Sequence, residues 1–130
     1  MAAAADLERV DLFHGLAEDE LARLAEWFDV QTVSAGVRLI GEGASGYSFY
    51  VLLEGSAVVT NGDETVATCK PGDFFGEIAI LGDSRRTATV TTTSPATLLV
   101  MFGTEFRRLQ QEHPAIAAEL ERAMRERAGL

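Results

Sequence analysis

The stretch FGEIAILGDSRRTATV, residues 75–90, is the most informative part of this chain. Gly76 has no Cβ, so the backbone there can come close to a bound molecule. Glu77 supplies a carboxylate that can accept a hydrogen bond from a sugar hydroxyl. Ile78–Leu81 fits one short helical turn, whose free N–H groups and dipole favour an anion. Arg86 adds a planar guanidinium suited to phosphate oxygens, so the stretch predicts a site for a phosphorylated sugar compound.

Each of these residues also has an ordinary structural interpretation. A Gly-Glu pair is common, and an Arg85-Arg86 pair on a surface loop is usually just solvated. As a set at fixed spacing, however, residues 75–90 resemble the phosphate-binding cassette of the cyclic nucleotide-binding domain family. That family's pattern is Phe-Gly-Glu, an apolar residue, Ala, two apolar residues, a short loop, then Arg, a small residue, Ala and Thr. The stretch matches this pattern throughout, without a gap.

The resemblance implies a role for each residue of the cassette. Glu77 would accept a hydrogen bond from the ribose 2′-hydroxyl, and Arg86 would pair with an exocyclic phosphate oxygen. Backbone N–H groups of Ile78, Ala79 and Thr87 would complete the anion cradle. Because an unpaired charge is costly in a nearly dry pocket, we expect Arg86 to contact a protein group when the pocket is empty. The implied ligand-binding residues are Gly76, Glu77, Ile78, Ala79, Arg86, Thr87 and Ala88.

The resemblance also implies contacts to the base of the nucleotide. Val59 and Val66 align with barrel positions that pack against the base. Leu120 and Met124, on the last expected helix, could cover the base as a lid. All four residues could equally be ordinary core residues, and the sequence leaves both interpretations open. In the family the C-terminal helix moves toward the pocket when nucleotide binds, which would relay binding to an effector outside this chain.

Thr87 bears on the choice between cAMP and cGMP. Members of the family that resemble protein kinase G or the nucleotide-gated channels carry Thr at this position, where it can help to hold the guanine amino group. Its hydroxyl can also contact a phosphate oxygen, which is compatible with cAMP. We expect cAMP rather than cGMP only because cAMP is the commoner second messenger.

The rest of the chain predicts a mainly β fold. Between residues 29 and 102, short β-branched segments alternate with Gly or Pro turns at a spacing of roughly 8–12 residues, which favours an antiparallel sandwich or barrel. Asn61-Gly62-Asp63 is a hairpin signal. With the resemblance, the expected architecture is an antiparallel β-jelly roll (double-stranded β-helix) of about eight strands. An N-terminal helical segment and two C-terminal helices would flank it.

Helical periodicity is confined to the two ends of the chain. An apolar stripe predicts a helix over residues 16–28, with Ala17 in place of the usual Ser or Thr cap. After the strands, Thr104 is expected to cap one helix and Pro114 to open the next. The expected single domain, residues 1–130, therefore has a helical segment at 7–28, a β-roll at 29–102 with the cassette at 75–90, and lid helices at 104–128.

Composition limits the possible partners. The chain has 130 residues and a formal net charge of −9, so an acidic surface argues against binding nucleic acid. No apolar run approaches the roughly 20 residues that span a membrane, so no membrane insertion is expected. Cys69 is the only cysteine, which excludes an intramolecular disulfide and is compatible with a cytoplasmic location.

An enzyme is not expected. A metal-dependent jelly roll needs several histidines and a carboxylate on adjacent strands, but the two histidines here, His14 and His113, lie outside the expected strands. Neither a metal nor a cofactor other than the nucleotide ligand is predicted. The alternative is a nucleotide-blind relative that serves as a protein-interaction or oligomerisation module. Glu77 and Arg86 argue against it, because degenerate members commonly lose one of the two, while an oligomer stays open under either hypothesis.

Overall fold

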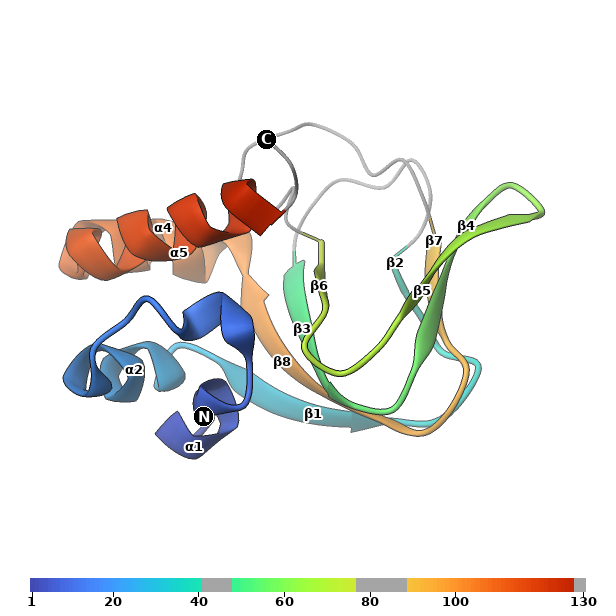
Figure 1. Ribbon diagram of the computed structural model, residues 1–130, viewed down its shortest axis with the longest axis horizontal. Helices are drawn as coiled ribbons and strands as arrows, with labels where there is room; N and C mark the ends of the chain where they lie inside the picture. The colour runs from blue at the N-terminus through green and yellow to red at the C-terminus, as the bar shows by residue number, and fades with distance from the viewer. Residues whose placement is uncertain (41–47, 77–88, 128–130) are drawn as a thin grey trace.

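Helices occupy the two ends of the chain and strands the middle in the computed structural model, which describes residues 1–40, 48–76 and 89–127 (Figure 1). The helices are α1 (Ala4–Glu8), the 3-10 helix η1 (Asp11–Phe13), α2 (Glu18–Ala25), α4 (Gly103–Glu112) and α5 (Pro114–Arg127). The strands are β1 (Asp29–Val33), β2 (Arg38–Ile40), β3 (Ser48–Glu54), β4 (Ala57–Asn61), β5 (Glu64–Cys69), β6 (Phe74–Phe75), β7 (Thr89–Thr92) and β8 (Ala96–Phe102).

The strands form two antiparallel sheets. The first has the order β1-β8-β3-β6 and the second the order β2-β7-β4-β5. Figure 1 shows the two sheets facing each other, with the helices gathered on the outer side of the first sheet. The predicted fold class, an antiparallel β-roll with flanking helices, is confirmed. The predicted hairpin at 61–63 joins β4 to β5, with Gly62 at φ +63°.

Strand β3 explains why the first sheet is apolar on both faces. Phe49, Val51 and Leu53 belong to a core that the helices cover, which we call the helical core. Leu52, which alternates with them, belongs to a second core between the two sheets, which we call the roll core. Side chains of a strand alternate between its faces, so an almost unbroken apolar run is what a strand needs when both faces are covered.

The helix starts differ from the sequence prediction at one position. Helix α4 begins at Gly103 with Phe102 as its N-cap, and the Phe102 N–H donates to Glu105 Oε1 at 3.0 Å. Thr104 is therefore inside the first turn, and its predicted capping role is wrong. Ala17 is the N-cap of α2, as expected, and its N–H donates to Glu20 Oε1 at 2.9 Å. In both helices a carboxylate at the third position reaches back to the cap, which supplies half of a capping box without a hydroxyl.

One predicted helix is too long, and two short elements were not predicted. The helix expected over residues 16–28 is shorter, because α2 ends at Ala25. Leu16, at the predicted start, and Phe28, the last residue of the apolar stripe, are buried just outside the helix, so their burial reflects tertiary packing. Helix α1 and the two-residue strand β6 were not predicted, since neither is long enough to show a period.

Gly55 closes the tight turn between β3 and β4, and we expect Gly55→Ala to lower the free energy of unfolding by about 2 kcal/mol. Its φ is +96°, and an added Cβ would lie 2.4 Å from the backbone oxygen of Pro95. Gly72→Ala is the matched control, because Gly72 has φ +97° with nothing within 4 Å of the added Cβ. Denaturant unfolding should show a smaller loss for Gly72→Ala, and equal losses would mean that the close approach to Pro95 costs nothing.

Candidate ligand-binding site

The cassette begins at the end of β6. Gly76 is buried there with φ +79°, a backbone conformation that glycine adopts without steric cost. The chain re-enters the described structure at Thr89, the first residue of β7. Glu77, Ile78, Ala79, Arg86, Thr87 and Ala88 lie outside the described residues, as does the contact expected of Arg86 in an empty pocket.

The strand register brings the flanks of the cassette to one end of the roll. Tyr50 pairs with Phe75, so the start of β3 lies beside the end of β6 in the first sheet. Ile40 pairs with Val90, so the end of β2 lies beside the start of β7 in the second sheet. The cassette therefore connects, in the sequence, an edge strand of one sheet to an inner strand of the other.

Tyr50 and Phe75 form an aromatic pair at this end, which sequence reasoning missed. Their rings are stacked, with centroids 5.3 Å apart and an interplanar angle of 22°. Both pack with the roll core, and the Tyr50 hydroxyl donates to the Leu39 carbonyl oxygen at 3.4 Å. Tyr50 thus links the first sheet to β2 of the second sheet. The alternation along residues 48–54 carried a signal, but only the pairing of β3 with β6 identifies the partner ring.

The two valines expected to contact the base have different environments. Val59, on β4, is half-buried, pairs with Ala67 and Val90, and packs against the roll core. Val66, on β5, is 54% exposed and lies where the register between β4 and β5 shifts. The structure therefore places Val59 on the wall of the roll and leaves Val66 at a bulge with half of its surface open. Their contact with a base stays a prediction.

The two lid candidates lie in the helical core. Leu120 is 1% exposed and Met124 is 0% exposed, and both belong to the cluster formed by the helices and the outer face of the first sheet. This placement is the core interpretation that the sequence left open. A contact with the base would require α5 to leave the packing observed here.

The described residues contain one thiol, that of Cys69, and no metal-binding cluster. They include no group of three or more His, Cys, Asp or Glu side chains that could hold a metal ion. Cys69 is buried, and its burial, with the nearby Asp73 carboxylate, raises the pKa of the thiol. Because the thiolate is the reactive form, this cysteine is a poor nucleophile. No helix in the described part of the chain is long and apolar enough to cross a membrane.

An antiparallel roll that is covered by helices on one sheet, with Phe-Gly-Glu in the sequence at the end of β6, defines a class of β-roll domains. Within that class, the family model described as cyclic nucleotide-binding domain matches residues 30–113, which include the whole cassette. The chain belongs to the cyclic nucleotide-binding domain family.

Two relatives are named for different cyclic nucleotides. The cAMP-dependent protein kinase regulatory subunit of Hypocrea atroviridis is 37% identical over 103 residues, which cover 79% of this chain and 22% of that protein. The cGMP-dependent protein kinase, isozyme 1, of Drosophila melanogaster is 32% identical over 111 residues, covering 79% of this chain and 14% of that protein. The chain thus spans only a small part of the length of these relatives.

Solved structures share the fold over almost the whole chain. The N-terminal domain of a transcriptional regulator from Streptomyces coelicolor A3(2) matches with a TM-score of 0.81 and 26% identity, covering 95% of this chain and 91% of that one. The catabolite activator protein of Thermus thermophilus matches with a TM-score of 0.75 and 26% identity, covering 90% of this chain and 57% of that one.

Proposed function

We propose that this domain binds a cyclic nucleotide through its cassette and passes the binding event to an effector outside the sequence. The observation that carries the proposal is the family match across residues 30–113, with the cassette residues present in the segment that joins β6 to β7. In this proposal Glu77 binds the ribose hydroxyl, and Arg86 binds the phosphate with backbone N–H groups beside it.

The proposed ligand is cAMP, with cGMP as the alternative. The relative with 37% identity is a regulatory subunit of a cAMP-dependent kinase, which supports cAMP. The relative with 32% identity is a cGMP-dependent kinase, and Thr87 offers a hydroxyl to either ligand. Residue-level discrimination between the two bases depends on this hydroxyl and on the side chains that line the roll.

The proposed role is regulatory, without catalysis in these 130 residues. The effector would be a protein or a further domain, and a kinase catalytic subunit is one candidate because several relatives are kinase regulatory subunits. We also propose that residues 1–130 form one domain with a cytoplasmic location. The net charge of −9 argues against a nucleic-acid partner.

We expect calorimetric titration of the purified domain to give a dissociation constant of about 1 µM or tighter for cAMP and a weaker one for cGMP. The ratio of the two affinities measures the preference, and Thr87→Ala should change that ratio if its hydroxyl contacts guanine. Folded protein free of carried-over nucleotide is the required starting material. Absence of heat and of binding with both nucleotides would favour the nucleotide-blind interaction module instead.

A further inference from the structure

A polar groove opens where the end of α2 meets α4, away from the cassette. Its volume is about 380 Å³, and its lining residues are Glu26, Trp27, Glu105, Arg108, Glu112 and His113. Figure 1 shows α2 and α4 on the same side of the first sheet. The groove therefore belongs to the helical half of the domain, and none of its lining residues is a predicted nucleotide contact.

The groove has an aromatic floor that already accepts a guanidinium. Trp27 is half-buried, and the Arg108 guanidinium carbon lies 5.5 Å from the centre of its ring. His113 contacts the same ring edge to face, with centroids 6.2 Å apart, which fixes the orientation of the indole. An indole face held in place in this way attracts cations, and the planar guanidinium of arginine stacks on it better than an ammonium does.

The charges around this floor are unbalanced. Three carboxylates, from Glu26, Glu105 and Glu112, line the groove together with the guanidinium of Arg108, so its acidic and basic side chains give a formal charge of −2. Arg108 lies 3.6 Å from Glu112, and Glu105 accepts the hydrogen bond from the cap of α4. The Glu26 side chain is exposed and has no hydrogen-bond or ion-pair partner within residues 1–40, 48–76 and 89–127.

We propose that this groove binds an arginine side chain presented by a partner protein. The guanidinium of the partner would lie over Trp27 beside or in place of Arg108, and Glu26 would accept its hydrogen bonds. The negative charge of the groove complements a basic segment. Only the identification of this partner with the effector rests on the proposed function; the arginine site itself does not.

Trp27 is the only tryptophan in the chain, so its fluorescence reports on this groove alone. The probe is a blocked hexapeptide with two arginines among glycines and serines, titrated into the nucleotide-free domain. We expect a saturable change in fluorescence. A matched peptide with citrulline, which keeps the shape and lacks the charge, should give none, and a lysine peptide should bind more weakly.

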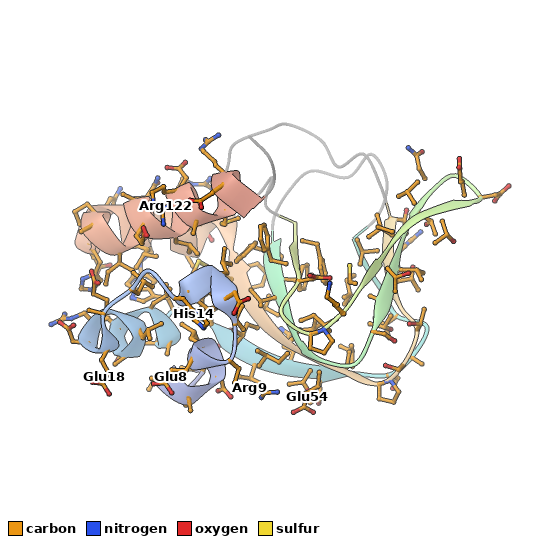
Figure 2. The ribbon with its side chains drawn as sticks, in the orientation of Figure 1. Glu8, Arg9, His14, Glu18, Glu54 and Arg122 are labelled. Atoms are coloured by element: carbon orange, nitrogen blue, oxygen red, sulfur yellow. The ribbon has the colours of Figure 1, made fainter. Side chains whose placement is uncertain are left out.

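Variants of the groove sharpen the test. Glu26→Gln should weaken binding of the arginine peptide by about three- to fivefold. Glu18→Gln, which removes the same charge from the exposed start of α2, is the matched control and should leave the affinity unchanged. Figure 2 shows Glu18 at the edge of the molecule. Arg108→Gln should strengthen binding, because it removes a competing guanidinium and a positive charge.

Equal binding of the arginine and citrulline peptides would overturn the proposal. So would equal weakening by Glu26→Gln and Glu18→Gln, since that result would mean attraction by overall charge. Binding of the arginine peptide without binding of a cyclic nucleotide would refute the proposed function and support the arginine site in the groove. Binding of a cyclic nucleotide without binding of the arginine peptide would refute only the arginine site.

Discussion

Replacing Arg86 with alanine or lysine should lower the affinity for cAMP by roughly tenfold or more. The guanidinium offers two parallel donors to a phosphate, and both substitutions remove that fork, although lysine keeps the positive charge. The comparison of the two variants therefore separates the geometry of the contact from its charge. Calorimetric titration of each variant with cAMP measures the change directly.

Arg85 provides the control for this experiment, because it is the same residue type one position away. The family pattern assigns no phosphate contact to it, so Arg85→Ala should keep the affinity of the parent protein within about threefold. An unchanged dissociation constant in Arg86→Ala would remove Arg86 from the site. Equal losses in both variants would indicate attraction by local positive charge rather than a specific pair.

Leu120→Ala should lower the free energy of unfolding by about 3 kcal/mol in the absence of nucleotide. The side chain is 1% exposed in the helical core, so truncation removes buried methyl groups and leaves a cavity. Denaturant unfolding of the free domain measures the loss. A residue that served only as a lid over an open pocket would show no such loss.

Arg125→Ala is the matched control on the same helix. Arg125 is exposed and pairs with Glu121 at 3.4 Å, a surface ion pair whose loss should cost about 0.5 kcal/mol or less. If Leu120→Ala unfolds at the same denaturant concentration as the parent, the packing described for α5 is wrong. Titration of Leu120→Ala with cAMP tests the lid role separately, because loss of a contact with the base would also lower the affinity for cAMP.

The position of Leu120 and Met124 sets a condition on any movement of α5. Both side chains are buried in the helical core of this structure. A helix that moved to cover the base would take them out of this core, so its interactions with the ligand must offset the packing lost against η1 and α4. Ligand binding can shift the equilibrium between the two positions of α5 only by the difference between these two free energies.

Much of the β-roll could be predicted from short-range signals. All eight strands that the structure describes lie within residues 29–102, the segment predicted to be β, because turn residues separate short runs rich in β-branched and apolar residues there. The hairpin at 61–63 follows from the need for a positive φ, which Gly62 provides. Strand β6 was not predicted, because two residues are too few to show the alternation of a strand.

The predicted cap at Thr104 failed for a physical reason. Any hydroxyl at the start of a helical period is a reasonable cap, but strand β8 continues to Phe102 and the helix begins directly after it. The Glu105 carboxylate then satisfies the backbone N–H that a capping hydroxyl would not reach. The end of β8 thus sets the start of α4, and the local sequence around Thr104 does not indicate where β8 ends.

The sequence by itself determined the family, the class of fold and the candidate phosphate-binding residues, because these depend on residue types at fixed spacing along one short segment. The tertiary structure alone decided which apolar residues face which core. Val59 and Val66 carry the same side chain, yet one lies on the roll core and the other is half exposed at a bulge. It also decided that Trp27 meets Arg108 and His113, because a pairing between residues far apart in the chain depends on how helices pack, which no local pattern encodes.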